Sequence, residues 1–448
     1  MSTPTPGAST HSDEVVALGR SGGTRAGRWH SDGAVALGST GRAGVWLHEA
    51  MSITGTDRRT FDLLDPHLYR DVDRLHEALS WMRANEPVYR DDRNGLWGIT
   101  RHADLKDVER RSTVFASGQG YRAIWAPDEI NMIAQDDPRH RQQRLLVQGD
   151  LTGAAVAQRK PEIDALTAQL IDAAVGAGSM EVVDAIAGQL PARLTCRLIG
   201  YPEDIWRDVK SWSERLMRID MRERDGQTFT DFIDANMEFV QALMPVAQER
   251  AKCPAHDLVS TWVHAEIDGQ RLPPQAIVHE VGLFISGGAE TTRTAIAHGL
   301  RAFVDHPDQW EAMAADPSLV PGAVEEVLRW VTPLNNMFRR AVADDEVGGQ
   351  RIRRGDRIVL LYPSANRDET VFDRPFEFDI RRDPNPQIAF GFGTHMCVGT
   401  NVARTTLAAV FGQLSQRITN LRVVSEPDVE PNIFARAVRR FELGFDLR

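Results

Sequence analysis

The stretch that decides the fold of this chain reads Phe-Gly-Phe-Gly-Thr-His-Met-Cys-Val-Gly at residues 390–399. It places Cys397 in a glycine-rich loop just before a helical pattern, and we expect that helix to begin near Val398. A thiol at a helix N-terminus faces unpaired backbone N–H groups and the positive end of the helix dipole. Both effects favour the thiolate, so the position predicts a lowered pKa for Cys397. The apolar residues at helical spacing are Ala403, Leu407, Val410, Phe411 and Leu414.

The glycines of this loop favour a flat ligand. Gly391, Gly393 and Gly399 let the backbone turn sharply and let a planar group lie close to it. A thiolate beside a flat surface is what a haem iron needs as an axial ligand. The alternative for a lone cysteine is a buried structural thiol, and two further motifs weigh against it.

The spacing Phe-x-x-Gly-x-x-x-Cys-x-Gly, at Phe390, Gly393, Cys397 and Gly399, closely resembles the haem loop of the cytochrome P450 monooxygenases. The resemblance extends from about Phe61 to the C-terminus. It implies a mainly α fold with small β-sheets, the cytochrome P450 fold, in which haem lies between a long distal helix and the cysteine helix of a triangular helical prism. It also implies haem b (iron protoporphyrin IX) as the cofactor, with Cys397 as the axial ligand of its iron.

The second motif is Gly-Gly-Ala-Glu-Thr-Thr at 287–292, in the middle of a helical pattern from about 274 to 305. Two adjacent glycines inside a helix cost about 1 kcal/mol each relative to alanine, so they need a reason. The resemblance supplies one, since this helix crosses the distal haem face in the family and a local distortion leaves room for dioxygen. It implies that Thr291 diverts its hydroxyl from the helix ladder towards oxygen or water, and that Glu290 feeds protons from solvent. The alternative is a glycine pair for close helix packing, with Glu290 solvated.

The third motif is the i,i+3 pair Glu326 and Arg329. Alone it would be an ordinary surface salt bridge worth under about 1 kcal/mol. Its distance from the cysteine loop also resembles the family, which implies a structural triad with Arg382 that holds the proximal loop in place.

Several cationic side chains suit the two haem propionates. His140 and Arg144 are four residues apart on a predicted helix and therefore share a face. Together with Arg339 and His395 they match family positions that contact propionates, where a cation and a carboxylate form a strong, charge-assisted pair. A solvated surface cation is the alternative for each, and the neighbouring Arg340 competes with Arg339 for the role.

The resemblance also implies a pocket for an apolar substrate over the distal haem face. Residues 117–133 are the expected lid. Ordinary core packing is the alternative for Ile285 and Phe434. The pocket residues implied by family position are Ile285, Ala289, Leu334, Met337 and Phe434.

Composition excludes other classes. A net charge of −11 argues against non-specific nucleic-acid binding. The three cysteines are far apart in sequence, which gives no disulfide framework and fits a reducing cytosol, so we expect a cytoplasmic protein. The sequence contains no run of about 18 apolar residues, so no membrane span is predicted. A dinucleotide loop is ruled out because Met396 occupies the last glycine position, and His395 with Cys397 lacks further zinc ligands.

The chain is expected to divide into an extension and one catalytic domain. Residues 1–57 are rich in Gly, Ser, Thr, Ala and Arg and predict a disordered or non-native extension, with Met51 as an alternative start. Residues 58–448 predict a single cytochrome P450 domain. Its first elements are a short helix at 75–83 and a hairpin of 88–90 with 96–99 through Asn94-Gly95, and strands return near 351–361 and in the last twenty residues.

The resemblance implies a monooxygenase that inserts one oxygen atom of dioxygen into an unactivated C–H bond, with electrons from a ferredoxin and its reductase. Three functions stay open. A sterol side-chain or branched-lipid hydroxylase is favoured because 290–293, 336–337 and 362–369 look like actinobacterial enzymes of that kind. A tailoring hydroxylase of polyketides, terpenoids or peptides is the second. A non-catalytic haem sensor is the third, and the Glu290–Thr291 pair argues against it because a sensor needs no proton relay.

Overall fold

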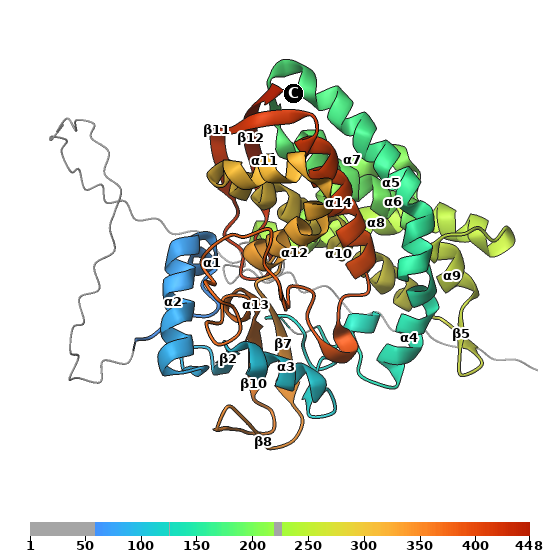
Figure 1. Ribbon diagram of the computed structural model, residues 1–448. Coiled ribbons are helices and arrows are strands. Elements are labelled where there is room, and N and C mark those ends of the chain that lie inside the picture. The colour runs from blue at the N-terminus through green and yellow to red at the C-terminus, as the bar shows by residue number, and fades with distance from the viewer. Residues whose placement is uncertain (1–58, 125, 219–225) are drawn as a thin grey trace, which may run out of the picture. The chain divides into compact units, whose positions relative to one another are not determined.

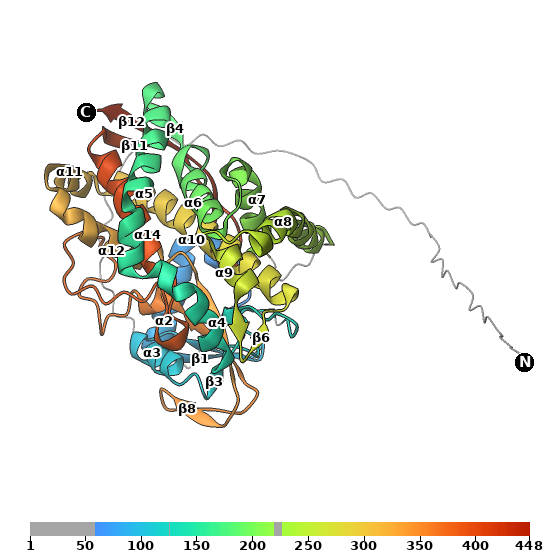
Figure 2. The ribbon, with the colours of Figure 1, turned by 90° about the vertical axis from the view of Figure 1, so that its right-hand side faces the viewer.

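The longest described helix, α10 (Pro274–Asp305), runs through the middle of the helical part of the molecule (Figures 1 and 2). It has the bounds that the sequence predicts, with Pro274 at the first helical position, where its missing N–H costs nothing. It is α-helical throughout, so the expected distortion at Gly287-Gly288 does not interrupt it. The helices packed against it include α6 (Gln189–Ile199), α7 (Trp206–Leu216), α12 (Val320–Val331) and α14 (Thr400–Ser415).

The computed structural model describes residues 59–124, 126–218 and 226–448, and the expected extension at 1–57 lies outside them. The unit formed by the described residues is mainly α-helical with small sheets, as predicted. None of its helices combines the length and apolar character that crossing a membrane requires. The remaining α-helices are α1 (Pro66–Arg70), α2 (Val72–Asn85), α3 (His102–Arg110), α4 (Arg139–Gln148), α5 (Gly153–Ala174), α8 (Gly226–Lys252), α9 (Leu258–His264), α11 (Pro307–Ala315) and α13 (Tyr362–Ala365).

Two sheets lie at opposite ends of this unit (Figures 1 and 2). The larger has the order β1-β2-β10-β7-β3 and is antiparallel except for the parallel pair β2 and β10. The smaller has the order β11-β12-β4, and two two-stranded ribbons complete the described strands. Their bounds are β1 Val88–Asp91, β2 Leu96–Ile99, β3 Phe115–Ala116, β4 Ser179–Glu181, β5 Glu266–Ile267, β6 Gln270–Arg271, β7 Asn336–Ala341, β8 Asp345–Val347, β9 Gln350–Ile352, β10 Arg357–Leu361, β11 Ile418–Val429 and β12 Val438–Leu447.

The local predictions hold with small shifts at element ends. The hairpin is confirmed, with Val88 opposite Ile99 and Gly95 at φ +64° in the turn. The helix predicted over 75–83 is α2, which extends further at both ends. Its N-terminal start is fixed by Asp71, whose side chain accepts from the Arg74 N–H. The cysteine helix α14 begins at Thr400 rather than near Val398, because Gly399 lies outside helical geometry as its N-cap.

Two hydrophobic clusters hold α10 at either end. The C-terminal half packs with α12 and α14, where the Phe303 ring lies 5.6 Å from Phe411 and 5.1 Å from Trp310. The N-terminal half packs with α6, α7, α8 and α9. Burial of apolar surface on both halves fixes the helix, so its glycine-containing middle is held at a defined place.

Candidate active site

A cavity of about 630 Å³ is lined by the middle of α10 and by the loop that carries Cys397. From α10 it receives Gly287, Gly288 and Thr291. Segments far apart in sequence complete the wall, including α4, α6, β7 and the connection between β11 and β12. The sequence-predicted residues that line it are His140, Arg144, Thr291, Leu334, Met337, Arg339, Phe390, His395, Cys397, Gly399 and Phe434.

Cys397 is held at the cavity by its backbone. Its N–H donates to the Phe390 carbonyl at 2.9 Å, and its own carbonyl accepts from the Thr400 hydroxyl at 3.3 Å. Burial raises the pKa of the Cys397 thiol, while the Gly399 N–H, Arg144 and Arg404 lower it. The expected net lowering is therefore wrong, because desolvation outweighs the helix-end and cationic contributions. A metal ion bound to the sulfur would reverse this balance, since metal coordination deprotonates a thiol.

The four predicted cations gather at one end of the cavity. The rings of His140 and His395 lie 4.0 Å apart, and His140 Nδ1 is 3.1 Å from Asp137 Oδ1. Burial, followed by Arg339, His140 and Arg144, lowers the pKa of His395 to about 2. At that pKa the His395 imidazole is neutral near neutral pH, so the positive charges of this cluster are those of Arg144 and Arg339, and two carboxylates would pair with them.

The glycines of the loop let other groups approach its backbone closely. Gly393 has φ +72°, and a Cβ there would lie 2.5 Å from the Glu109 carbonyl oxygen, so a side chain is excluded. Gly399 lies beside the sulfur, where a Cβ would be 3.8 Å from Cys397 Sγ. The thiol, the glycines and the cations for two carboxylates therefore fit haem b.

Thr291 faces the cavity, but its hydroxyl is not diverted from its own helix. Thr291 Oγ1 donates to the Gly287 carbonyl oxygen at 2.7 Å, which is the i−4 bond common for threonine in helices. The hydroxyl oxygen keeps its lone pairs as acceptors. Thr291 can therefore accept a hydrogen bond from a group in the cavity while its own hydroxyl donates to the Gly287 carbonyl oxygen.

Glu290 lies in an ion network away from the cavity wall. Its side chain is fully buried, pairs with Arg293 and lies 3.5 Å from Arg439 Nη1 on β12. Arg293 also pairs with Glu214 on α7, and Arg439 pairs with Glu430. The alternative that Glu290 is solvated is therefore wrong. The role of Glu290 in feeding protons stays a prediction.

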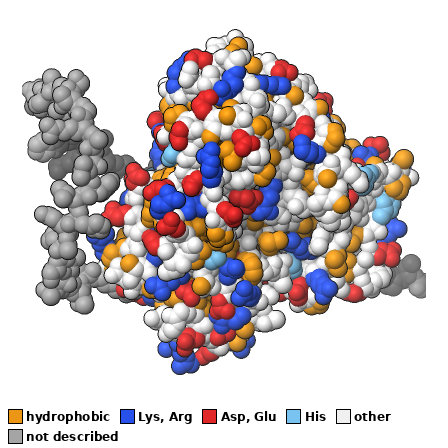
Figure 3. All heavy atoms as spheres, viewed as in Figure 1, with side chains coloured by type: hydrophobic (Ala, Val, Ile, Leu, Met, Phe, Trp, Pro, Cys, Tyr) orange, Lys and Arg blue, Asp and Glu red, His pale blue; other side chains and the backbone are white. Residues whose placement is uncertain are grey.

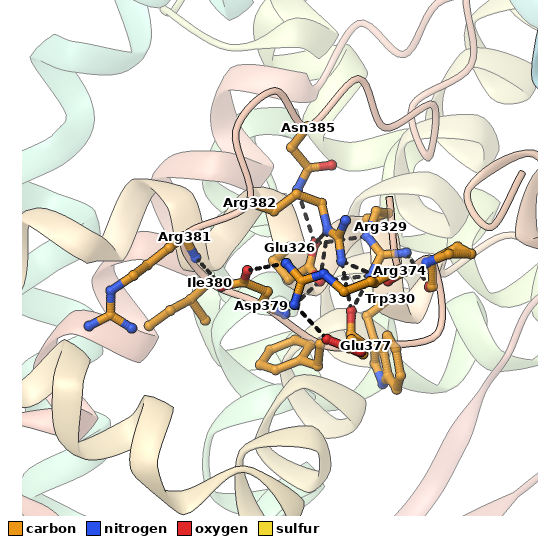
Figure 4. Close-up of polar contacts among 12 residues, drawn as sticks. Glu326, Arg329, Trp330, Arg374, Glu377, Asp379, Ile380, Arg381, Arg382 and Asn385 are labelled. Atoms are coloured by element: carbon orange, nitrogen blue, oxygen red, sulfur yellow. Dashed lines mark hydrogen bonds and ion pairs between the residues drawn. The ribbon is translucent and has the colours of Figure 1, made fainter. Parts of the chain in front are cut away.

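The predicted triad is buried and assembled (Figure 4). Glu326 and Arg329 are both 0% exposed and form a bidentate pair at 2.7 and 2.8 Å, while Arg382 Nε lies 3.2 Å from Glu326 Oε2. Arg329 and Arg382 also donate to the Glu377 carbonyl at 3.0 and 2.9 Å. Glu326 and Arg329 of α12 thus fix the position of the segment that leads into the cysteine loop.

The substrate pocket differs in part from expectation. Leu334, Met337 and Phe434 line the cavity. Ile285 and Ala289 do not, because they face the hydrophobic cluster of the N-terminal half of α10. The pocket prediction is corrected for these two, and core packing, the alternative noted for Ile285, applies to both.

Sequence reasoning missed several residues of the wall. Glu109 on α3 and Tyr362 on α13 lie beside Arg339, and Tyr121 and Arg122 enter from the predicted lid segment. Thr195 of α6 meets the α10 glycines, since a Cβ on Gly288 would lie 2.7 Å from its hydroxyl oxygen. Tyr362 begins the run 362–369, and Tyr121 and Arg122 lie in the predicted lid, but no local pattern marked any of these five as a wall residue.

One cavity thus offers a thiol, carboxylate-binding cations and an alcohol, which is the donor set of a haem–thiolate enzyme. The chain belongs to the cytochrome P450 family, whose profile matches residues 206–439. The steroid C26-monooxygenase of Mycobacterium tuberculosis (strain ATCC 25618 / H37Rv) is 38% identical over 84% of this chain and 94% of its own. That of Rhodococcus jostii (strain RHA1) is 32% identical over 86% of this chain and 84% of its own.

Solved structures show the same fold. A Mycobacterium marinum cytochrome P450 in complex with pseudoionone has a TM-score of 0.79 and 31% identity, over 87% of this chain and all of that one. A mutant of P450 EryK in complex with erythromycin B has a TM-score of 0.77 and 28% identity, over 84% of this chain and 97% of that one.

The protein is a monooxygenase with haem b as its cofactor. When bound, haem with a thiolate ligand activates dioxygen for insertion of one oxygen atom into a C–H bond. In this chain Cys397 is placed to supply the thiolate, and His140, Arg144, Arg339 and His395 to hold the carboxylates.

Proposed function

We propose that this protein hydroxylates the terminal methyl group of a steroid side chain. The observation that carries the proposal is the similarity to steroid C26-monooxygenases, which extends over most of the chain at 31–38% identity in several actinobacterial relatives. The chain covers most of the length of these relatives.

The cavity lining suits an apolar substrate. Its wall beyond the thiol and the cations is mostly apolar, and Phe434, Met337 and Leu334 belong to it. Further apolar wall residues are Met132, Ile133, Leu194, Leu198, Met217, Leu283 and Phe284. A terminal methyl is an unactivated C–H group, which such a wall can direct towards Cys397 without polar contacts.

The test is an optical titration of the ferric protein with sterol ketones, methyl-branched fatty acids and macrolides. A substrate that displaces water from the iron shifts the Soret band to the blue. We expect a saturable shift with sterol ketones and a product hydroxylated at the side-chain terminus by mass spectrometry. No shift with any sterol, or hydroxylation on the ring system only, would contradict the proposal.

A tailoring hydroxylase is the second candidate. The structural similarity to a P450 in complex with erythromycin B favours it. The macrolides of the same titration separate the two, because a saturable shift with macrolides and none with sterols would support tailoring.

For the substrate pocket we predict that Phe434→Ala weakens sterol binding by roughly tenfold, because part of a large apolar contact of about 1.5–3 kcal/mol is lost. The measurement is the dissociation constant from the same titration. Ile285→Val is the matched control, since Ile285 is buried in the neighbouring core and does not line the cavity. Equal affinities in both variants and the wild type would show that Phe434 does not contribute to substrate binding.

For proton delivery we propose that Thr291 and Glu290 manage the protons that dioxygen reduction requires. Thr291→Ala should lower the product formed per electron pair by at least about tenfold and raise peroxide release, since proton transfer by a positioned group contributes roughly 10²–10⁴-fold. Thr291→Ser retains the hydroxyl and should keep most of the coupling. Undiminished coupling in the alanine variant would remove this role.

For the electron donor we propose a ferredoxin that docks near α4 and the cysteine loop. Arg141 is exposed on α4, Leu145 is 59% exposed and Met396 is 41% exposed, so a cation lies near apolar side chains that a partner can cover. On the face drawn in Figure 3, basic and acidic side chains are interspersed, and docking would depend on local charge rather than on one large basic patch. Arg141→Glu should slow reduction by ferredoxin while leaving reduction by dithionite unchanged.

A further inference from the structure

Glu109 is a buried carboxyl group at the cationic end of the cavity. It lies near the end of α3, is 4% exposed and belongs to the cavity wall with Arg339 and His395. Its Oε1 accepts from the Tyr362 hydroxyl at 2.8 Å and lies 3.5 Å from Arg339 Nη2. Its Oε2 has no hydrogen-bond partner among the described residues. A buried carboxyl oxygen without a partner is costly, which calls for a role at this place.

The same residue is fixed against the cysteine loop. A Cβ on Gly391 would lie 3.2 Å from Glu109 Oε1, and one on Gly393 would lie 2.5 Å from the Glu109 carbonyl oxygen. Both glycines have positive φ, +70° and +72°, which only glycine adopts readily. The backbone contact between α3 and the loop therefore sets where the Glu109 carboxyl group lies relative to Cys397.

The charges around Glu109 come from several elements. Arg339 lies on β7 and Tyr362 on α13, while His395 shares the same cavity end from the loop. On α3 itself, Lys106 and Arg110 lie against the Phe392 ring and not against the carboxyl group. Burial raises the pKa of Glu109 to about 7, against Arg339, Tyr362 and the Phe392 backbone, which lower it.

Arg339 connects Glu109 to the site expected to bind the haem carboxylates. Its side chain is 4% exposed, and its Nη1 donates to the Phe338 carbonyl at 2.7 Å while Nη2 faces Glu109. A guanidinium fixed on two sides presents its remaining donors in a defined direction, which suits bidentate binding of a carboxylate. Without Glu109, one of these two restraints is lost.

We propose that Glu109, held by Tyr362, is a positioning residue that orients Arg339 towards the haem carboxylates and adds a further carboxyl group to that site, so that its charge contributes to the reduction potential of the bound haem. The inference concerns the cofactor and does not depend on the substrate. A negative charge near the iron favours the ferric state over the ferrous state, so Glu109 lowers the potential when ionised.

The test compares Glu109→Gln with the wild-type holoenzyme. Glutamine has the same shape and its amide oxygen still accepts from Tyr362, while the charge is removed. The midpoint potential from a spectroelectrochemical titration should shift upwards above the pH of about 7 at which Glu109 titrates, and the shift should shrink below it. Haem transfer to apomyoglobin should become several-fold faster, because Arg339 is less well fixed.

Asp107→Asn is the matched control on the same helix. Asp107 pairs with Arg111 and is not part of the cavity wall, so removing its charge should leave the potential and the haem-transfer rate unchanged. Tyr362→Phe is the second variant. It removes the hydrogen bond from the Tyr362 hydroxyl to Glu109, so it should also accelerate haem transfer. An unchanged potential and transfer rate in Glu109→Gln, or equal shifts in Glu109→Gln and Asp107→Asn, would overturn the proposal.

Discussion

Replacing Cys397 by serine should abolish monooxygenase turnover while leaving the fold intact. The serine hydroxyl is a poor ligand for iron and cannot donate electron density as a thiolate does, so O–O cleavage is no longer favoured. We expect turnover to fall by at least about 10³-fold, which corresponds to about 4 kcal/mol in the activation barrier. The measurements are product formation and the spectrum of the ferrous–carbon monoxide complex, which should lose its thiolate character.

Cys253→Ser is the control for this experiment. Cys253 is an exposed free cysteine and lies outside the cavity wall, whereas Cys196 is buried in the core and would change stability as well. The control should retain the wild-type spectrum and turnover. A thiolate-type spectrum in Cys397→Ser would contradict the assignment of the ligand.

Removing the carboxylate of Glu326 should destabilise the protein by about 3–5 kcal/mol, because it leaves two arginines with an uncompensated charge in the interior. Glu326 accepts from Arg329, from Arg382 and from the Asp379 backbone N–H, the last at 2.8 Å (Figure 4). Glu326→Ala therefore breaks every one of these contacts at once. The measurement is urea unfolding followed by far-ultraviolet circular dichroism, at fixed haem concentration because a bound ligand adds to stability.

The neighbouring Glu325 offers a matched control. It pairs with Arg404 at 2.6 Å, and these two side chains remain 29% and 41% exposed. Glu325→Ala should cost less than about 1 kcal/mol, as is usual for a solvent-screened pair. Equal losses in the two variants would show that burial does not distinguish the triad from a surface ion pair.

Local sequence patterns were sufficient for the elements that carry the site. The bounds of α10 follow from Pro274 and the apolar periodicity, and the hairpin follows from Asn94-Gly95 between two short apolar runs. The glycines of the loop motif also have a local reason, the positive φ of Gly391 and Gly393, beside their close approach to Glu109. Such features depend on neighbours in sequence, and so they can be read without the fold.

Contacts between distant segments could not be predicted in the same way. The i,i+3 pair Glu326–Arg329 is visible in the sequence, but only packing decides that it is buried, so that removing one partner leaves an uncompensated charge. Ile285 and Ala289 lie on the expected helix yet face its core side, because the packing of the neighbouring helices sets which part of α10 meets the cavity. The pKa of Cys397 moved against expectation for the same reason, since desolvation is a property of the assembled interior.

The sequence by itself indicated the family through the resemblance of its motifs, and it predicted Cys397 as the cofactor ligand and the course of the main helices, because motifs and helices depend on short-range spacing and residue type. Only the tertiary structure decided the surroundings of each charge. It placed Glu290 in an ion network with Arg439, 149 residues away, and Glu109 beside Arg339 and the cysteine loop. Electrostatic energies depend on distance and burial in three dimensions, which no spacing along the chain records.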